Sequence, residues 1–446
     1  MSELPGGWME LKLGDVVNYA DNTTVQPDAM QEDAWLLELE DIERDSSHIL
    51  AYETVGKRKP QSAKNSFHAG DVLYGKLRPY LNKVVRADRN GYSSSEIIAI
   101  KPNQLDGGYL FHYLKSPRFR DYVQAVTHGV RMPRLGTEQA KTAPFLLPPL
   151  AEQKRIAQKL DTLLAQVDTL KARIDAIPAL LKRFIQSVLT SAATCELTSE
   201  WRATQGLDDP VPTKLGELIR TGPQNGLYKP SSAYGSGTKI VRIDGFYSGE
   251  LRDWHSFRSL QLDAREEQVW ALKVGDILIN RVNSIEYLGK CALVRSLPGP
   301  TVFESNMMRI AVDERVIEPE FLMRALSAEI GRARLIANAK HAVNQASINQ
   351  RDVKACSILV PTLSEQTEIV RRVEQLFAYA DQLETKVATA QQRINTMTQS
   401  LLAKAFRGEL VPQDPSDEPA SVLLERIRNQ RAATPKPKRG RKAAAH

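Results

Sequence analysis

Apolar residues recur at alternating steps of four and three along a stretch from Glu152 to about Leu189. This spacing is typical of a helix that pairs with a second helix of the same kind. Because so narrow an apolar stripe covers little surface, we expect the stripe to be buried against another helix. The stripe consists of Ile156, Leu160, Leu163, Val167, Leu170, Ile174, Ile177, Leu181, Phe184 and Val188.

The same spacing returns between Glu365 and about Leu402, with each position 213 residues after its counterpart, as Ile369 is after Ile156. The flanking sequences repeat as well, since Glu152-Gln153 is matched by Glu365-Gln366. Two unrelated amphipathic helices would share a period but not their flanks, so the pattern predicts an internal duplication. The second stripe consists of Ile369, Val373, Leu376, Ala380, Leu383, Val387, Ala390, Ile394, Met397 and Leu401.

The two stripes predict a pair of long helices, each roughly 55–60 Å long. Two copies of one unit usually pack about a pseudo-twofold axis, so we expect the helices to run antiparallel as a coiled-coil-like rod with a globular unit at each end. Pro178 lies inside the first helix and predicts a bend there. The expected seam comprises Ile156, Leu160, Leu163, Val167, Leu170 and Ile174 on one side and Ile369, Val373, Leu376, Leu383, Val387 and Ile394 on the other.

The rest of the chain predicts two similar α/β domains, giving an α+β fold with an internal repeat. Gly70-Asp71-Val72-Leu73 is matched by Gly275-Asp276-Ile277-Leu278, whereas the intervening loops differ. A stretch rich in Gly, Ser and Pro, residues 221–238, predicts a long surface loop. The expected divisions are an N-terminal domain (1–147), a central helix (148–197), a C-terminal domain (198–360), a distal helix (361–410), a linker with a short docking helix that buries Val422, Leu423 and Ile427 (411–433), and a disordered basic tail (434–446).

Composition and charge add little to this picture. Of the 446 residues, 25% are charged, and the net charge of +7 permits a polyanionic partner without establishing one. Cys195, Cys291 and Cys356 are far apart, which favours buried, reduced thiols. We expect a cytoplasmic protein, because the sequence contains no run of about 18 apolar residues and does not open with a signal peptide.

The sequence shows no pattern of residues that predicts a reaction centre. There is no phosphate-binding Gly-rich loop, and Leu147-Pro148-Pro149-Leu150 lacks the Asp or Asn of an amino-methyltransferase motif. Glu38, Glu40 and Asp41 have the chemistry to bind Mg²⁺, but solvated or strand-edge carboxylates are the favoured interpretation. We therefore expect that this chain binds no metal and no cofactor. Its role would be to supply specificity to a partner enzyme.

Duplex DNA is the ligand that best suits two different polar surfaces held apart by a rigid spacer. Successive faces of its groove return every ~34 Å. Lys and Arg would contact phosphates, while other loop side chains would read base edges. The candidate DNA-binding residues lie in basic and polar loops: Lys76, Arg78, Tyr80, Arg131 and Arg134 in the first domain, and Tyr228, Lys229, Arg281, Asn283, Lys340 and Asn344 in the second.

The chain resembles the specificity subunits of type I restriction–modification systems over essentially its whole length. The resemblance rests on residues 147–156, which read LPPLAEQKRI, on their echo VPTLSEQ at residues 360–366, and on the helix-end segments 195–201 and 405–410. One departure is Ala193-Thr194-Cys195, where the second copy has Phe406-Arg407-Gly408.

The resemblance implies two target-recognition domains that read an asymmetric bipartite DNA site. It also implies two modification (methyltransferase) subunits bound to the helices, and restriction subunits in a larger complex. S-adenosylmethionine, and the ATP and Mg²⁺ needed for restriction, would then be bound by those partners. Two alternatives stay open from the residues alone: an adaptor that presents two protein-binding modules, and a nuclease that acts by itself.

Overall fold

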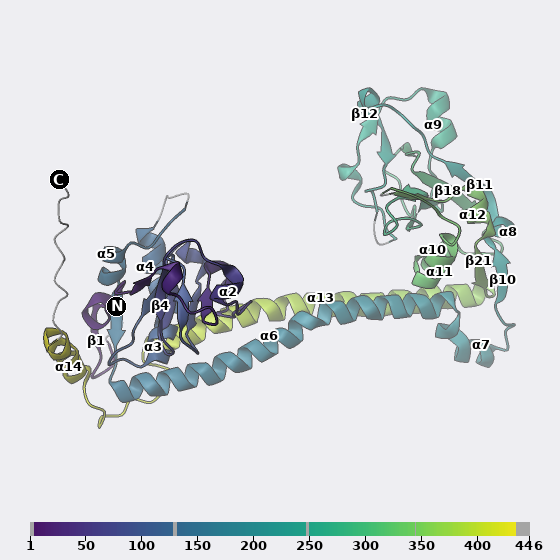
Figure 1. Ribbon diagram of the computed structural model, residues 1–446. Coiled ribbons are helices and arrows are strands. Elements are labelled where there is room, and N and C mark those ends of the chain that lie inside the picture. Colours follow the sequence, from purple (N-terminus) through teal and green to yellow (C-terminus); the bar gives the residue numbers. More distant parts are fainter. Residues whose placement is uncertain (1–3, 128–131, 247–248, 344, 434–446) are drawn as a thin grey trace, which may run out of the picture. The chain divides into compact units, whose positions relative to one another are not determined.

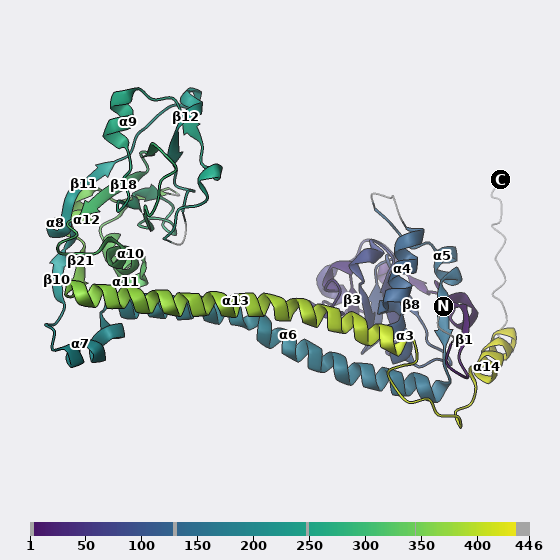
Figure 2. The ribbon, with the colours of Figure 1, turned by 180° about the vertical axis from the view of Figure 1, so that it is seen from behind.

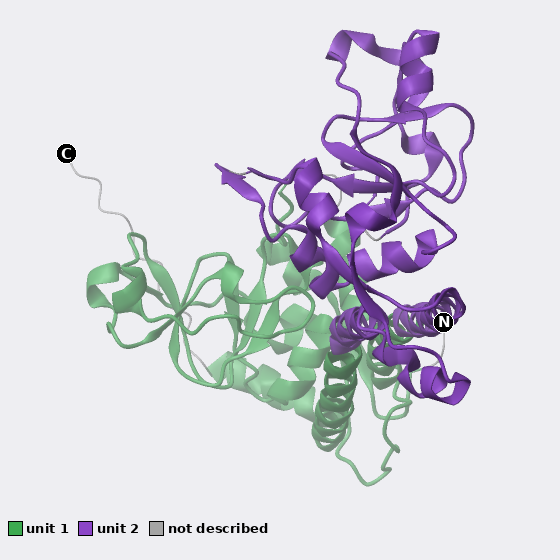
Figure 3. Ribbon diagram, turned by 90° about the vertical axis from the view of Figure 1, so that its right-hand side faces the viewer, with its two compact units in different colours: residues 1–174, 389–446 green, residues 175–388 purple. Residues whose placement is uncertain are grey.

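The computed structural model describes residues 4–127, 132–246, 249–343 and 345–433, and the chain forms two compact units. Unit 1 contains residues 1–174 and 389–446, and unit 2 contains residues 175–388 (Figure 3). The candidates Arg131 and Asn344 and the predicted basic tail (434–446) lie outside the described residues.

Unit 1 contains three groups of strands. Its first and last strands, β1 and β9, pair antiparallel, with Met9 opposite Leu147. The other strands form a three-stranded antiparallel sheet of order β6-β5-β8 and a four-stranded sheet of order β2-β4-β7-β3. Their bounds are β1 (Met9–Lys12), β2 (Thr24–Val25), β3 (Trp35–Leu37), β4 (Lys64–Phe67), β5 (Val72–Gly75), β6 (Val84–Arg86), β7 (Gly91–Ser93), β8 (Ile97–Ile100) and β9 (Pro144–Leu147).

The helices of unit 1 bury a core rich in aromatic side chains. Tyr109 and Tyr113 of α3 are fully buried with Phe119 of α4 and Phe145 of β9. Their hydroxyl groups remain hydrogen-bonded, since Tyr109 donates to the carbonyl of Leu146 at 2.8 Å. The bounds are α1 (Leu13–Val16), α2 (Val55–Arg58), α3 (Gly107–Lys115), α4 (Pro117–Val126), α5 (Thr137–Thr142) and, after residue 405, α14 (Ala420–Ala433).

Unit 2 repeats this plan with additional strands. The pair β10–β21 answers β1–β9, and the order β16-β14-β18 answers β6-β5-β8, with β11 added at one edge. The parallel pair β12–β17 answers β3–β7. The strands are β10 (Val211–Lys214), β11 (Ile219–Asn225), β12 (Tyr234–Val241), β13 (Ser259–Leu260), β14 (Ile277–Asn280), β15 (Val282–Asn283), β16 (Cys291–Leu293), β17 (Thr301–Phe303), β18 (Met307–Val312), β19 (Lys340–Ala342), β20 (Gln345–Ser347) and β21 (Ser357–Val360).

Helices α8 to α12 of unit 2 follow the same order as α1 to α5 of unit 1, and α7 precedes them. Their bounds are α7 (Ser199–Gln205), α8 (Leu215–Leu218), α9 (Ala264–Trp270), α10 (Pro319–Ser327), α11 (Glu329–Leu335) and α12 (Gln350–Ala355). Matching side chains fasten each domain to the start of its long helix. Gln153 accepts a hydrogen bond from the backbone N–H of Asp106 at 3.0 Å, and Gln366 accepts one from Glu318 at 2.7 Å. The predicted internal duplication is therefore confirmed.

The two long helices are α6 (Leu150–Ala193) and α13 (Leu363–Ala405), slightly longer than predicted (Figures 1 and 2). Unit 1 holds the first part of α6 with the last part of α13, and Leu160 shares a core with Leu402. Unit 2 holds the remainder, and Val188 shares a core with Ile369. Within each unit the helices thus run in opposite directions, as predicted. Helix α6 continues through Pro178, and the bend expected there stays a prediction.

The seam residues differ in their burial. Ile156, Leu160, Ile369 and Val373 are fully buried, because they also pack against the domain cores. Val167, Val387 and Ile394 are buried, whereas Leu163, Ile174, Leu376 and Leu383 are partly buried. Leu170 departs from the expected stripe, since 47% of it is exposed, and Met397 is 49% exposed. The periodicity marks which face is apolar but not whether a partner helix covers every turn of it.

The predicted docking helix, α14, packs on the N-terminal domain of unit 1. The backbone N–H of Ala420 donates to the carbonyl of Gly7 at 3.1 Å, and the guanidinium of Arg431 donates to the carbonyls of Gly14 and Asp15. Leu423 and Ile427 are buried as predicted, but Val422 is exposed and Leu424 is buried instead. Only three-dimensional packing decides between these adjacent apolar positions.

We expect Leu423→Asp to lower the free energy of unfolding of unit 1 by about 3 kcal/mol or more, because it would bury a carboxylate without a partner. Val422→Asp is a matched control, since Val422 is 38% exposed, and should change the free energy by less than about 0.5 kcal/mol. Urea denaturation of both variants measures the difference. Equal effects would show that α14 does not stabilise the domain.

The stretch from residue 221 to residue 238 is not the single long loop predicted from its composition. Strand β11 extends to Asn225 and pairs with β18, and β12 begins at Tyr234. Although this segment contains Gly and Pro, its backbone forms strand hydrogen bonds with β18. Composition cannot reveal such pairing, because it depends on a distant part of the chain. The true loop is therefore short, and it carries Tyr228 and Lys229.

The three cysteines are buried and unpaired, as predicted. Burial raises the pKa of the Cys195 thiol to about 12 and that of Cys356 to about 11, which keeps both thiols protonated. Among the described residues, no helix has both the length and the apolar character needed to cross a bilayer.

Candidate nucleic-acid interface

In unit 1 the structure brings most of the predicted residues together at the end of β5. The backbone N–H of Lys76 donates to the carbonyl of Glu96, and its carbonyl accepts from Leu135, both at 2.9 Å. The N–H of Arg78 donates to the carbonyl of Pro133 at 2.8 Å. The loop that begins at Lys76 is thereby held against the segment that contains Arg134. We call Lys76, Arg78, Tyr80 and Arg134 the unit 1 cluster.

The side chains of the unit 1 cluster differ in how available they are to a ligand. Arg78 is exposed and has a left-handed backbone conformation, with φ of 48°, and Tyr80 is 53% exposed. The guanidinium of Arg134 donates to both carboxylate oxygens of Glu96, at 3.1 and 3.2 Å. Arg78 and Tyr80 are therefore the better placed of these residues to meet a ligand.

Unit 2 builds a second cluster on the same backbone frame. The N–H of Arg281 donates to the carbonyl of Asn306, and its carbonyl accepts from Ile348, both at 2.9 Å, as for Lys76. Strand β15 pairs with β20, which pairs with β19, so Asn283 and Lys340 lie in one small three-stranded sheet. We call Arg281, Asn283 and Lys340 the unit 2 cluster.

Arg281 supports this frame with its side chain as well. Its guanidinium donates to the carbonyl of Ser305 at 2.9 Å and is only partly exposed. Lys340, in contrast, is exposed on β19. Arg281 is thus bonded to both Ser305 and Asn306 and holds this segment in place. The ammonium group of Lys340 faces solvent.

Tyr228 and Lys229 lie in a loop that is bonded to Ser305. The N–H of Ser305 donates to the carbonyl of Leu227 at 2.9 Å, which brings the loop onto the strand end. Only glycine fits at position 226, because a Cβ atom there would lie 2.2 Å from the carbonyl oxygen of Glu304. Tyr228 is 78% exposed, whereas the ammonium of Lys229 pairs with Glu266 at 2.6 Å.

These residues line a hollow in unit 2 that the sequence did not predict. Besides Tyr228, Lys229, Ser305 and Asn306, its lining residues are Leu227, Ser231, Tyr234, Arg242, Arg258 and Glu304. Arg242 and Arg258 were not among the candidates, because each follows an ordinary apolar strand or turn. Nothing in the sequence predicts that Arg242, at the end of β12, lines the same hollow as Tyr228.

The basic loop of residues 57–64 is largely neutralised within the domain. Lys57 pairs with Glu53 at 2.7 Å, Arg58 with Asp41 at 2.5 Å and Lys64 with Glu38 at 2.6 Å. The carboxylates of Glu38 and Asp41 are thus occupied by cationic side chains. Among the described residues, no group of three or more His, Cys, Asp or Glu side chains is placed to hold a metal ion.

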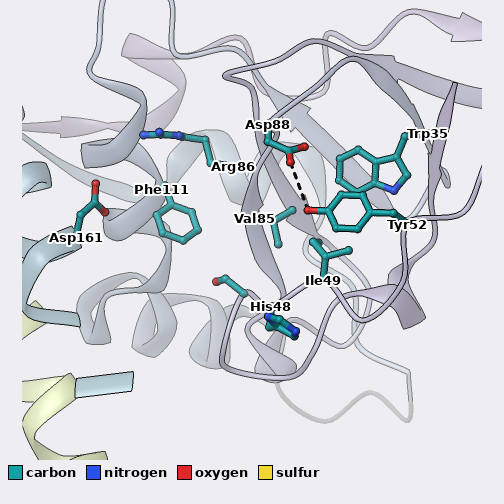
Figure 4. Close-up of a pocket in the computed structure, with 10 residues that line it drawn as sticks. Trp35, His48, Ile49, Tyr52, Val85, Arg86, Asp88, Phe111 and Asp161 are labelled. Carbon is teal, nitrogen blue, oxygen red and sulfur yellow. Dashed lines mark hydrogen bonds between the residues drawn. The ribbon is translucent and has the colours of Figure 1, made fainter. Parts of the chain in front are cut away.

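A further hollow in unit 1 contains none of the predicted residues (Figure 4). Tyr52 donates to Asp88 at 3.4 Å beside Trp35, and Arg86 and Asp161 lie on the opposite wall. The hydrogen bond from His112, at 2.7 Å, lowers the pKa of the Asp161 carboxyl. Because two carboxylates accompany Arg86, this hollow does not offer a polyanion a strongly cationic surface.

The two clusters and the unit 2 hollow combine cations, amides, hydroxyl groups and exposed tyrosines. Such groups can contact phosphates and donate to or accept from base edges.

Three comparisons place these features among known proteins. The sequence model for the type I restriction modification DNA specificity domain matches residues 5–179 and 251–390. The chain is 37% identical over 354 residues to the EcoKI specificity subunit of Escherichia coli K12, covering 77% of this chain and 76% of that one. It is 29% identical over 469 residues to the Escherichia coli EcoDI specificity subunit, covering 99% of both chains.

Solved structures agree in fold. The HsdS subunit from Thermoanaerobacter tengcongensis superimposes with a TM-score of 0.58 at 20% identity, covering 92% of this chain and 98% of that chain. A chain from a study of assembly and conformational transition of the type I R-M system gives a TM-score of 0.67 at 19% identity, covering 92% and 100%.

Proposed function

The chain belongs to the family of type I restriction–modification specificity subunits, and we propose that each unit reads one half of an asymmetric, bipartite duplex DNA site. The protein is a non-catalytic subunit that recognises DNA sequence. The proposal goes beyond this in assigning the unit 1 cluster to one half-site, and the unit 2 cluster with its hollow to the other.

A single observation carries this division. Lys76 and Arg281 occupy the same place on the repeated frame, with the same backbone partners, yet their surroundings differ. In unit 1 the next exposed groups are Arg78 and Tyr80, while in unit 2 they are Lys340 and Tyr228. One scaffold that presents two different sets of side chains suits two different base sequences.

We further propose that the long helices set the gap between the half-sites and bind two modification subunits. The incompletely covered stripe of unit 1 supports the second role, since Leu170 and Met397 are 47% and 49% exposed. Exposed apolar side chains on a paired helix suit burial by another protein. Restriction subunits would join the larger complex. S-adenosylmethionine would be bound by the modification subunits, and the ATP and Mg²⁺ needed for restriction by partner subunits. We place the complex in the cytoplasm, in keeping with unpaired cysteines.

Substitutions in the two clusters test the division. We expect Arg78→Ala to weaken discrimination in one half-site, and Arg281→Ala in the other, by about tenfold or more each. Mobility shifts with the chain bound to its modification subunits, on duplexes altered in one half at a time, give the measurement. The target can be identified by mapping methylated adenines in the host DNA.

Arg315→Ala is the control, because the side chain of Arg315 is 88% exposed and pairs only locally with Asp313. It should leave both halves unchanged. Equal losses at both half-sites for either cluster variant would contradict the division. A wild-type complex that does not prefer any duplex sequence would contradict the proposed function itself and favour an adaptor role.

A further inference from the structure

The hollow of unit 2 contains an arginine that is held in place on two sides. Arg242 directly follows β12, and its Nε donates to the Oε2 atom of Glu304 at 3.1 Å. Its guanidinium carbon also lies 5.9 Å from the centroid of the Tyr234 ring. Both contacts restrict the plane of the guanidinium before any ligand arrives.

Glu304 is itself held rigidly. The residue is 8% exposed, and its Oε1 atom accepts a hydrogen bond from the backbone N–H of Ile243. Its own N–H donates to the carbonyl of Val241 at 3.0 Å. Glu304 is therefore bonded to the backbone on both sides of Arg242, through its carboxylate on the side of Ile243 and through its own N–H on the side of Val241.

The repeat shows that this arrangement belongs to unit 2 alone. Glu304 precedes Ser305 as Ser94 precedes Ser95 in the first copy. Ser94 has no carboxylate and therefore cannot form the ion pair that Glu304 forms with Arg242. Residues that carry the fold recur between the copies, so a buried carboxylate present in only one copy points to a task that differs between them.

Glu304 accepts the hydrogen bond of Nε, so a ligand in the hollow would be bound by the two terminal amino groups of Arg242. Exposed Tyr228 and Arg258 and the amide of Asn306 share the same hollow. A planar pair of N–H donors fits the O6 and N7 acceptors of guanine. The same planar donors can pair with two oxygens of a phosphate, but only a contact with a base makes binding depend on the base pair at one position.

We propose that Arg242 is a specificity-determining residue that recognises a guanine in the half-site read by unit 2, and that Glu304 is the positioning residue that orients it. The proposal rests on the proposed function, because it assumes that unit 2 reads DNA sequence.

The test uses the full chain bound to its modification subunits and duplexes in which each base pair of the unit 2 half-site is replaced in turn. Arg242→Ala should abolish a preference of about tenfold or more for G·C at one position and leave the other positions unchanged. Arg242→Lys keeps the charge but not the planar donors, and should lose the same preference. Glu304→Gln should weaken that preference, and add nothing when combined with Arg242→Ala.

Arg265→Ala is the matched control, because Arg265 is an exposed arginine of unit 2 that does not line the hollow. It should keep every preference. If Arg242→Ala weakens all duplexes equally and reduces the salt dependence, while Arg242→Lys binds normally, Arg242 contacts a phosphate and the proposal is wrong. If Arg242→Ala changes nothing while the wild-type complex still discriminates in this half-site, the proposal fails and the proposed function stands.

Discussion

Gln153→Ala and Gln366→Ala are each expected to destabilise their own unit by about 2–5 kcal/mol. Both side chains are fully buried. Gln153 accepts from the N–H of Asp106 at 3.0 Å and donates to the carbonyl of Pro148 at 2.9 Å. Gln366 accepts from Glu318 and donates to two carbonyls, those of Pro361 at 2.9 Å and Val316 at 3.0 Å.

Alanine at either position would leave buried backbone groups without partners, and each such group costs about 1–3 kcal/mol. Gln366→Ala should have the larger effect, since it loses a further bond. Urea denaturation gives the size of the effect, and hydrogen exchange locates it in unit 1 or unit 2. Gln382→Ala, on the exposed surface of α13, is the control and should change stability by less than about 0.5 kcal/mol. Loss of protection in both units from one substitution would show that the two sites are not independent.

The second large effect is expected from lengthening the helices. Adding four residues after Ile174 and four after its counterpart Val387 lengthens each helix by about 6 Å, which is close to the rise of two base pairs. If the helices set the distance between half-sites, both half-site sequences should be kept and the gap between them should grow by one or two base pairs.

Sequencing of methylated adenines in cells that carry the variant measures the gap. Inserting the same four residues after Asp208, in an exposed loop of unit 2, is the control and should leave it unchanged. An unchanged gap in the helix variant would remove the proposed spacing role. Loss of methylation at every site would instead mean that the lengthened helices no longer bind the modification subunits.

The sequence predicted the long helices well because their apolar spacing is a property of the chain itself. The 213-residue repeat then predicted their antiparallel order, seen within each unit. It could not predict the exposure of Leu170, because a stripe shows which face is apolar and not which turns are covered. For the same reason α14 was expected, but its buried residue Leu424 was not.

The candidate site was predicted less completely. The loops that follow the recurring Gly-Asp turn led to Lys76, Arg78 and Arg281, and contact of these residues with DNA stays a prediction. Long-range neighbours were not predictable, since nothing in the sequence places Asp41 beside Arg58, where the two side chains pair at 2.5 Å. Arg242 gave no signal in the sequence, because the role proposed for it depends on Glu304, 62 residues away in the chain.

The packing of α14 has a consequence for the order in which the protein matures. Leu423, Leu424 and Ile427 complete the core of unit 1, whose first strand begins at Met9. The ribosome must therefore synthesise the chain through α14 before the core of unit 1 can be complete. Unit 2 occupies one continuous segment, residues 175–388, and its last residue is synthesised earlier than α14. Unit 2 can thus finish folding before unit 1. Until α14 is synthesised, the part of the unit 1 core that Leu423, Leu424 and Ile427 cover stays exposed to solvent.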